Sequence, residues 1–585
     1  MEREAKFNFF KFDSTNLLVF FVAIAFVVTY IGYFLPLLKY PNQPANPWPE
    51  AYEVIQERII VEKKVPPSAT PQFGQMERSD MTYFLNQHLL MVSLQLLNGL
   101  TPELNERFLG FIYTFLIFVS ASLFFAKFLQ PIQSFTASIF LLFIPRLANY
   151  YVNANGEFLG FLLLFLALYF ILDWYKTKEW KKLFLSAIII GILPILCLIT
   201  FGVFFLFLFS KFITDALLEK VFVKNLIRFF RLSLFFLIIS AILAIVPLLL
   251  TGDIKTGASS SIGSLYSKRS AAELYYEKKY YDEFATYGNS FIGLKPLIRD
   301  IYFITLDGTA LDFFIVFYLL TAVIGVLLAI KKPKNFDNIF PVVFAVVMLL
   351  FEIFLYSRFF NPSIYNSAER FLLYFSLPII LASTSGIVWL FGKNRLLYLI
   401  FFLTIVLSGL PIFKYAAYSA NSYNALYSPS FREAIDWLKQ NTPSDTIISS
   451  NDWSNGQFWL GAERFSISEG GKASATYMTY ENIYGKLQGS REIFSAETTC
   501  EQSREIIAKY NLSYLLIWSR PTAYYIYPYL QSKNKLEKCG FEIHVDVGEN
   551  GATKSMIQEL VGMIRANNFE AKTKPESFAA SNVAD

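Results

Sequence analysis

The sequence contains few of the residues that build metal sites, disulfide frameworks and soluble surfaces. Its 585 residues include only 3 cysteines and 2 histidines, which argues against a zinc site made of these ligands and excludes a disulfide-rich secreted module. Charged residues make up 17% of the chain, whereas a soluble protein carries about 25%. The formal net charge of +5 is small and scattered, so it gives no sign of nucleic-acid binding. An ordinary soluble enzyme and a disordered chain are excluded on the same grounds.

Apolar residues dominate the sequence instead. They make up 54% of the chain, and its 62 phenylalanines occur in runs such as 204–209 and 234–237, as lipid-facing helices would have them. A helix needs about 20 apolar residues to cross about 30 Å of hydrocarbon. The sequence therefore predicts an α-helical polytopic membrane protein with about 11–13 transmembrane helices. Eleven spans can be assigned directly, at roughly residues 15–37, 106–127, 132–150, 157–175, 182–199, 201–218, 230–250, 311–330, 338–357, 370–391 and 396–414.

Lysine and arginine residues flank these spans in clusters. Such residues favour the cytoplasmic side of a membrane, and with the N-terminus inside, the clusters all fall in the cytoplasm. This orientation predicts an integral cell-membrane protein with three segments outside: residues 38–105, 251–310 and 415–585. The first apolar stretch is long and lacks a small-residue cleavage site, so we expect a retained span rather than a signal peptide. The clusters lie at residues 176–182, 220–231, 331–334 and 393–395.

The C-terminal segment has a different pattern, in which short strand-like runs alternate with helix patterns. This alternation predicts an extracytoplasmic α/β domain over residues 415–565, after a transmembrane domain over residues 1–414. The polar tail, residues 566–585, is expected to be disordered. Cys500 and Cys539 both lie in the outer domain, where a disulfide and two free thiols are equally compatible with the sequence. The strand-like runs are 446–448 and 515–518, and the helix patterns are 430–439 and 501–510.

Polar residues in the predicted outer segments are the candidates for a functional site. Ionisable and polar side chains at membrane depth are costly to keep, so those near the outer ends of spans are functional candidates. They are Asp80 (followed by Tyr83 and Phe84) and its rival Asn46 in the first outer loop, Arg146, Asn153, Asn155 and Glu157 between the third and fourth spans, Glu273 in the second large loop, Arg370 at the start of the tenth span, and Trp453, Ser454 and Gly456 at the start of the outer domain.

The acidic candidates resemble, in order and topology, motifs of the oligosaccharyltransferase catalytic subunit, especially the archaeal and bacterial single-subunit enzymes of the GT-C class. Asp80 resembles the acid of that family's first outer loop. Asn155-Gly156-Glu157 resembles its DxD-type motif, and Ser270-Ala271-Ala272-Glu273 its mobile-loop motif. The resemblance implies that the three acids are catalytic and that, with Asn155, they hold a divalent cation, Mn²⁺ or Mg²⁺. Asn155 stands where the family has Asp, and an amide oxygen brings no formal charge to such a site.

The basic and aromatic candidates resemble the family's substrate-binding motifs. Arg370 resembles the arginine of a late span, and Trp453-Ser454-Asn455-Gly456 resembles the end of the WWDYG motif that reads the acceptor sequon. The resemblance implies that these residues, together with Arg146, bind the substrates. Ser454 stands where the family has Asp, which leaves the acceptor open.

The reaction that the resemblance implies moves a glycan from a polyprenyl (di)phosphate to an acceptor Asn of a protein at the outer membrane face. A cation would offset the charge of the leaving phosphate, and an arginine would donate hydrogen bonds to its oxygens. Carboxylates would accept the hydrogens of the acceptor amide. The expected partners are therefore a polyprenyl-linked glycan, a protein acceptor and membrane lipid, with no nucleic acid, and we expect a monomer.

Each candidate also has a structural explanation, and other functions stay open. Asp80 can cap a helix, Glu157 can stabilise a helix N-terminus, and Arg370 can pair with Glu369. The second hypothesis is a GT-C enzyme that moves a single sugar from a polyprenyl monophosphate. The third is a non-catalytic protein that binds lipid-linked glycans or partner proteins. A transporter is less favoured, since Glu352 is the only acid well inside a predicted span on the outer half.

Overall fold

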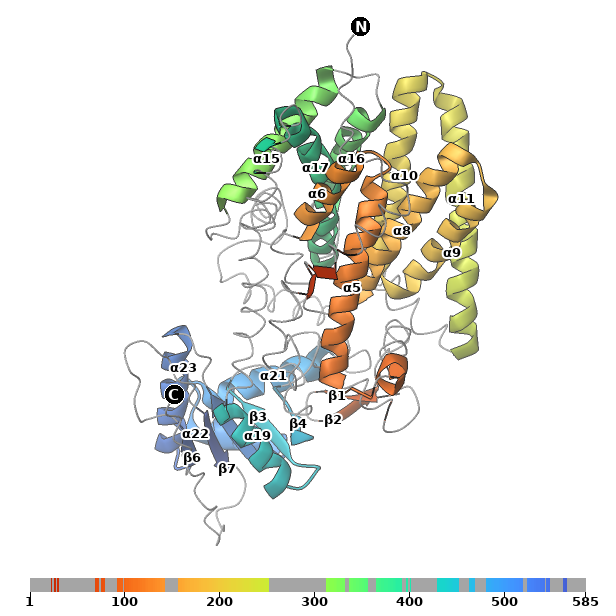
Figure 1. The fold of residues 1–585 in the computed structure, drawn as a ribbon. Coiled ribbons are helices and arrows are strands. Elements are labelled where there is room, and N and C mark those ends of the chain that lie inside the picture. The colour runs from red at the N-terminus through yellow and green to blue at the C-terminus, as the bar shows by residue number, and fades with distance from the viewer. Residues whose placement is uncertain are drawn as a thin grey trace. The chain divides into compact units, whose positions relative to one another are not determined.

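The computed structural model divides into two compact units (Figure 1). The first comprises Met1–Pro41, Glu106–Ser259 and Phe284–Ser419, and the second comprises Asn42–Asn105, Ser260–Glu283 and Ala420–Asp585. The structure describes residues 23, 26–27, 29–30, 61, 69–72, 75–78, 92–97, 99–100, 102–142, 156–251, 312–331, 336–355, 365–391, 396–397, 400, 429–451, 462–468, 480–518, 523–541, 543–547 and 561–565.

The first unit is built from long apolar helices. Within the described residues, five of these helices are long and apolar enough to cross a membrane, which confirms the predicted membrane protein. Each of the long helices overlaps one predicted span. They are α5 (Pro102–Phe125), α6 (Pro131–Leu142), α8 (Gly156–Thr177), α9 (Trp180–Leu196), α10 (Leu198–Glu219), α11 (Phe222–Thr251), α15 (Asp312–Lys331), α16 (Phe336–Leu355) and α17 (Tyr365–Phe391).

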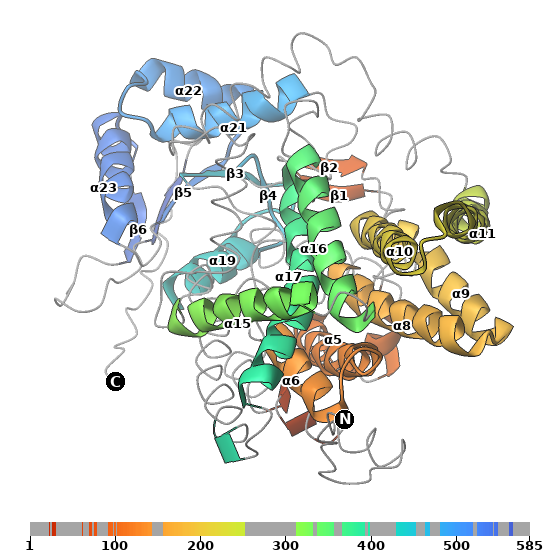
Figure 2. The ribbon, with the colours of Figure 1, turned by 90° about the horizontal axis from the view of Figure 1, so that it is seen from above.

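The break between α9 and α10 falls at Cys197, close to the predicted boundary between residues 199 and 201. Cys197 has an extended backbone with φ −158° and ψ 98°, although its N–H still donates to the Leu193 carbonyl. Pro194, inside the last turn of α9, has no N–H to donate and disfavours further helix. As a result, α9 packs against both α8 and α11, and Figure 2 shows it between them.

Helices α15 and α17 approach each other at backbone contact distance. A Cβ atom on Gly325 would lie 1.9 Å from the Ala382 carbonyl oxygen, and one on Gly386 would lie 2.0 Å from the Thr321 carbonyl oxygen. The hydroxyls of Thr321 and Ser383 share a hydrogen bond of 2.7 Å across the same contact. Small residues commonly permit this packing between membrane helices. The contact fixes the position of α17, the helix that carries Arg370.

The phenylalanine runs are divided between the bundle interior and its surface, which corrects the expectation that they face lipid. Phe204, Phe207 and Phe236 are fully buried, whereas Phe209, Leu234 and Leu237 are exposed. The rings of Phe204 and Phe236 lie 4.9 Å apart and join α10 to α11. A helix that passes through a bundle has two environments, so an all-apolar run gives no sign of which side packs inward.

Three connections between helices gather at one end of the bundle. In the α5–α6 turn, Lys127 pairs with Asp173 near the end of α8, and Phe128 stacks 5.4 Å from Phe340 in the first turns of α16. Lys211, near the end of α10, lies 4.1 Å from the Tyr175 ring of α8. We call this the basic end, because the predicted clusters 176–182 and 220–231 begin there. The end at which α8, α10 and α17 begin is called the opposite end.

The second unit contains a five-stranded mixed sheet in the order β4–β3–β5–β7–β6. Strands β4, β3 and β5 are parallel, while β7 is antiparallel to both β5 and β6. Both predicted strand runs are strands here, and both helix patterns are helices, so the α/β character is confirmed. The elements are β1 (Ala69–Gln72), β2 (Gln75–Arg78), α19 (Pro429–Asn441), β3 (Ile447–Ser450), β4 (Phe465–Ser466), α21 (Tyr480–Phe494), α22 (Cys500–Lys509), β5 (Tyr514–Trp518), α23 (Ala523–Lys538), β6 (Ile543–Val547) and β7 (Val561–Arg565).

Two polar features hold the helices of this unit in place. Cys500 and Cys539 form a disulfide, so of the two possibilities that the sequence left open the structure has the bridge. The bridge joins the first residue of α22 to the residue after α23. Buried Arg464 donates to the Lys439 carbonyl (2.8 Å) and to the Thr442 hydroxyl (2.8 Å), and so satisfies the C-terminal end of α19. The tail, residues 566–585, lies outside the described residues.

Candidate functional site

At the opposite end, α8, α10 and α17 meet in one contact, which we call the ring junction. The Phe161 ring of α8 stacks on the Tyr374 ring of α17 with centroids 4.1 Å apart. The Tyr374 hydroxyl shares a hydrogen bond with the Thr200 hydroxyl of α10. Gly160 allows the close approach, since a Cβ there would lie 2.6 Å from Thr200 Oγ1. Because Tyr374 is nearly fully buried, this junction fixes the relative position of the N-terminal parts of three helices.

Two of the predicted site residues lie on the helical turns next to this junction. Glu157 is the second residue of α8, four residues before Phe161. Arg370 is the sixth residue of α17, four residues before Tyr374. Residues four apart share one face of a helix, and four residues advance the helix by about 6 Å. Both positions are therefore about one turn beyond the stacked rings along their helices.

A third ionisable residue, Glu352, is buried on α16. Its side chain has no solvent exposure, and within the described residues neither carboxylate oxygen has a hydrogen-bond partner. The preceding residue, Phe351, packs on Phe371 of α17 with ring centroids 5.1 Å apart, and the Phe371 ring also lies against Gly202 of α10. Glu352 and Arg370 are therefore each one residue away from this ring contact, Glu352 on α16 and Arg370 on α17. Sequence reasoning noted this lone acid but gave it no role, because its burial depends on which face of α16 packs inward.

The remaining predicted site residues lie outside the described residues, so their roles stay predictions. Across the described parts of the chain, no three histidine, cysteine or acidic side chains converge in a way that could hold a metal ion. Of the four predicted cation ligands, only Glu157 falls in that part. Those outside it are Asp80, Arg146, Asn155, Glu273, Trp453, Ser454 and Gly456.

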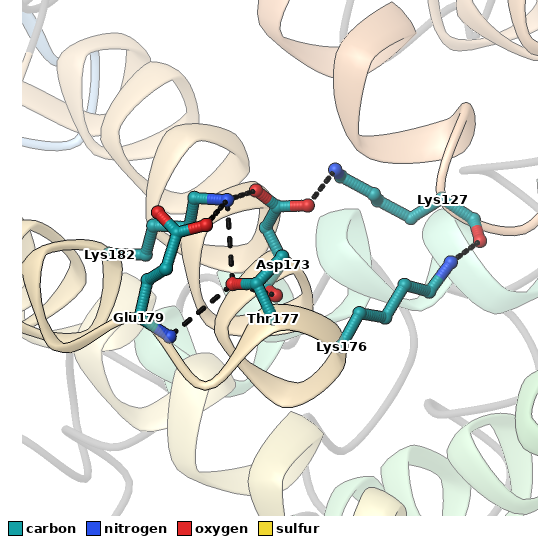
Figure 3. A network of polar contacts seen from close by, with 6 residues as sticks. All are labelled: Lys127, Asp173, Lys176, Thr177, Glu179 and Lys182. Carbon is teal, nitrogen blue, oxygen red and sulfur yellow. Dashed lines mark hydrogen bonds and ion pairs between the residues drawn. The ribbon is translucent and has the colours of Figure 1, made fainter.

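The basic end carries a network of ion pairs (Figure 3). Asp173 receives Lys127 at 2.6 Å and Lys182 at 2.5 Å, from the α5–α6 turn and from α9. Lys182 also lies 3.3 Å from Glu179, and Lys176 donates to the Lys127 carbonyl at 3.3 Å. The Asp173 and Lys127 side chains are only 19% and 15% exposed, so this pairing is largely shielded from solvent. The network ties three connections together and leaves no acid in it unpaired.

A second ion pair lies deeper at the same end. Buried Lys211 donates to both carboxylate oxygens of Asp215, at 2.9 and 2.8 Å, one turn further along α10. Its ammonium also lies 4.1 Å from the Tyr175 ring and 4.7 Å from the Phe336 ring. A buried ammonium is costly unless it is paired, and here the carboxylate and two ring faces offset that cost.

Comparison with known sequences gives two matches, both partial. The family model described as Ribonuclease H-like matches residues 468–585, which is less than half of the chain. YkuK of Bacillus subtilis, an uncharacterized protein, is 47% identical over 45 residues, which is 8% of this chain and 26% of YkuK. The match spans only about a quarter of the length of that relative. Neither match assigns the whole chain to a family.

Comparison with solved structures covers most of the chain. The oligosaccharyltransferase of Archaeoglobus fulgidus, in complex with Zn and sulfate, matches with a TM-score of 0.56 and 15% identity, over 85% of this chain and 67% of that one. ArnT from Cupriavidus metallidurans, bound to undecaprenyl phosphate, gives 0.53 and 10%, over 94% and 98%. The arabinofuranosyltransferase AftD from Mycobacteria gives 0.52 and 13%, over 95% and 40%. At these identities the likeness concerns the fold, and it confirms the predicted GT-C architecture.

Proposed function

From this GT-C fold, we propose that the chain is a membrane glycosyltransferase that takes a sugar or glycan from a polyprenyl-linked phosphate donor. The donor phosphate would bind at the opposite end of the bundle, beside the first turns of α8 and α17. One observation carries the proposal: the ring junction stacks Phe161 on Tyr374, and the next turns beyond it carry Glu157 and Arg370. A guanidinium can bind the phosphate that leaves when the glycan is transferred, and a carboxylate can hold a cation beside that phosphate or accept hydrogens from the acceptor.

Arg370 would bind the leaving phosphate. Charge develops on the phosphate oxygens as the bond to the sugar breaks, and a guanidinium can donate two parallel hydrogen bonds to them. The position supports this role, because α17 is held firmly by its backbone contact with α15 and by the ring junction. A guanidinium on a rigidly held helix is already close to its reactive position, so less entropy is lost when it binds the phosphate.

A divalent cation fits the donor set that the sequence offers. Carboxylate oxygens from Asp80, Glu157 and Glu273 and the amide oxygen of Asn155 are hard ligands of the kind that Mg²⁺ and Mn²⁺ prefer. When bound, such a cation would supply charge stabilisation for the leaving phosphate. The acids themselves would accept hydrogens from the acceptor nucleophile, which is the role of a general base.

For the acceptor, we propose an asparagine of a protein, read by Trp453, Ser454 and Gly456 in the outer domain. The resemblance of this segment to the oligosaccharyltransferase motif supports that choice. The Archaeoglobus fulgidus enzyme has also been solved with an inhibitory peptide and a dolichol-phosphate. We further propose that the basic end faces the cytoplasm, so that the donor site and the second unit face outward.

A second candidate is the transfer of a single sugar from a polyprenyl monophosphate. The observation that favours it is coverage, since the match to ArnT spans 98% of that chain whereas the match to the oligosaccharyltransferase spans 67%. The ArnT structure was solved with undecaprenyl phosphate bound. Both candidates use the same phosphate site and differ in the group transferred.

The test is a transfer assay with the purified full chain in lipid nanodiscs, with Mn²⁺ present. One arm supplies a polyprenyl diphosphate-linked oligosaccharide and a peptide with an Asn-x-Thr sequon, and the other a polyprenyl monophosphate-linked single sugar and a lipid acceptor. We expect glycopeptide in the first arm. Product in the second arm alone would select the second candidate, and the absence of product and of donor binding in both arms would refute the proposal.

Arg370 variants sharpen the same assay. Arg370→Ala should lower kcat/KM by about 10- to 100-fold, because hydrogen bonds to charged groups contribute roughly 1.5–3 kcal/mol. Arg370→Lys should retain part of the activity, since it keeps the charge but loses the two-pronged geometry. Glu369→Gln, at the adjacent position, serves as the matched control. Equal losses for Glu369→Gln and Arg370→Ala would argue against a phosphate-binding role.

A further inference from the structure

A small pocket lies at the basic end between α8, α10 and α11, far along the helices from the ring junction. Its polar lining consists of Tyr175, Asp215, Asn225 and Arg228, and phenylalanine and leucine side chains of α10 and α11 complete it. The pocket has room for about one water-sized group, about 10 Å³, within an empty space of about 260 Å³ that includes open solvent. A single hydroxyl therefore fits inside the pocket, and a larger group would lie in the solvent-open space beside it.

Asn225 brings an unsatisfied acceptor to this pocket. Its side chain is 3% exposed, and its Nδ2 donates to Glu219 Oε2 at 3.2 Å. This bond fixes the orientation of the amide, and Oδ1 is buried without a hydrogen-bond partner. A buried polar atom left unpaired is costly, so the position calls for a donor from outside the chain.

Arg228 brings an unpaired cation to the same pocket. It is half-buried on α11, one turn after Asn225, and within the described residues it makes no ion pair or hydrogen bond. Asp215, the acid that lines the pocket, is already occupied on both oxygens by Lys211. The guanidinium therefore keeps its donors for an anion.

The surroundings of the pocket carry an excess of positive charge. Partial burial, followed by the charges of Arg228 and Lys211, lowers the pKa of the Lys178 ammonium, and Asp215 and Glu219 oppose that effect only in part. An anion bound among these cations would relieve their mutual repulsion.

Two lysines next to the pocket occupy turn positions that usually favour glycine. Lys178 ends the α8 turn with φ 59°, and Lys220 ends α10 with φ 55°, both in the left-handed region. A side chain at such a position is strained relative to glycine. Both turns nevertheless present an ammonium at the end of the bundle, where the headgroups of a bilayer would lie.

We propose that this pocket binds the headgroup of an anionic phospholipid that carries free hydroxyls. Arg228 donates to the phosphate oxygens on the solvent-open side, with Lys178 nearby, and a headgroup hydroxyl enters the pocket and donates to Asn225 Oδ1. Basic pockets between membrane helices are known to select lipid headgroups in this way. The site is separate from the proposed donor site, so it would hold even if the chain transferred no sugar.

The test measures unfolding of the detergent-solubilised full chain as a function of added lipid, because a ligand of the folded state raises its unfolding midpoint. Phosphatidylglycerol offers phosphate and hydroxyls, phosphatidic acid offers phosphate alone, and phosphatidylcholine offers neither hydroxyl nor net charge. Glycerol 3-phosphate supplies the same groups without a membrane anchor. We expect phosphatidylglycerol to bind most tightly, phosphatidic acid less tightly, and the other two to give no shift at the same concentration.

Variants separate the pocket from general surface charge. Arg228→Gln should weaken phosphatidylglycerol binding about tenfold or more, while Arg231→Gln, an exposed arginine one turn further along α11, should leave it within about twofold. Asn225→Leu should abolish the preference for phosphatidylglycerol over phosphatidic acid. If Arg228→Gln unfolds without lipid, Arg228→Lys should still fold and bind several-fold more weakly.

Three outcomes would overturn the proposal. Equal losses for Arg228→Gln and Arg231→Gln would mean diffuse surface charge rather than a pocket. Equal shifts with phosphatidylcholine would mean nonspecific lipid binding. Binding of glycerol 3-phosphate as tight as that of phosphatidylglycerol would assign the pocket to a soluble phosphate compound.

Discussion

The two ends of the helix bundle differ in whether their buried acidic side chains have partners. At the basic end, Asp173 receives two lysines and Asp215 receives both of its hydrogen bonds from Lys211. At the opposite end, Glu352 is fully buried and has no hydrogen-bond partner within the described residues. Paired charges in a membrane protein fasten helices together, whereas an unpaired buried acid costs free energy without fastening anything. The acids of the basic end therefore contribute to stability, although Arg228 there has no ion pair within the described residues, whereas Glu352 is kept at the opposite end at a cost in stability.

The variant with the largest expected effect separates α15 from α17, the helix that carries the ring junction at its other end. Gly325→Val would place side-chain atoms inside the Ala382 carbonyl, so the two helices cannot keep their contact. We expect a loss of several kcal/mol, enough to prevent folding or to lower the midpoint of thermal unfolding drastically. Size-exclusion chromatography in detergent shows whether the variant folds, and thermal unfolding in the same detergent measures the change in its midpoint.

Gly191→Ala is the control for that variant. Its Cβ would meet only the ends of the flexible Leu243 and Ile239 side chains, so a much smaller loss is expected. If both variants behave alike, the α15–α17 backbone contact is not the feature that holds α17.

The next test removes the centre of the basic end. Asp173→Ala leaves Lys127 and Lys182 without their shared partner in a largely shielded position, and we expect a loss of about 2–3 kcal/mol of unfolding free energy. Glu179→Ala removes a more exposed pair and should cost less than about 0.5 kcal/mol. Thermal unfolding of both variants in the same detergent measures the two losses. An Asp173→Ala loss as small as that of Glu179→Ala would mean that the network does not stabilise the bundle.

Glu352→Gln tests the claim that the opposite end sacrifices stability. A fully buried, unpaired carboxyl group is kept in its neutral form, and an amide of the same shape is about as costly to bury, so we expect the variant to keep the stability of the parent within about 1 kcal/mol. A clear loss of stability would show that Glu352 has a structural partner and would remove the contrast between the ends.

Tyr374→Phe makes the smallest change, since it keeps the ring stacked on Phe161 and removes only the hydroxyl bonded to Thr200. We expect a loss of about 1 kcal/mol. A double-mutant cycle with Thr200→Val should show coupling between the two positions. Additive effects would mean that the hydroxyl bond does not contribute to the ring junction.

The sequence predicted the helices well, because the length of an apolar run is a local property. The break near Cys197 and the strands at 447–450 and 514–518 follow from the same kind of local pattern. Which residues pair across the bundle could not be predicted. Lys127 and Asp173 are 46 positions apart, and their pairing depends on how α5 and α8 pack.

The candidate site was predicted in part. Motif order drew attention to Glu157 and Arg370, and the structure puts both on turns next to the ring junction. The junction residues themselves, Phe161 and Tyr374, could not be predicted, because aromatic residues are so frequent in this sequence that no pattern distinguishes these two. The Phe204–Phe209 run was misread as lipid-facing for the same reason: composition does not reveal which face of a helix is covered.

The Cys500–Cys539 bond has a consequence for where the protein matures. Disulfides form and persist in oxidising compartments, so the second unit should cross the membrane before its thiols are joined. Buried Cys197 stays a thiol and provides an internal standard. After rapid denaturation in a thiol-reactive reagent, a chain made in its membrane should take up one label, whereas a chain whose second unit stayed in the reducing cytosol should take up three.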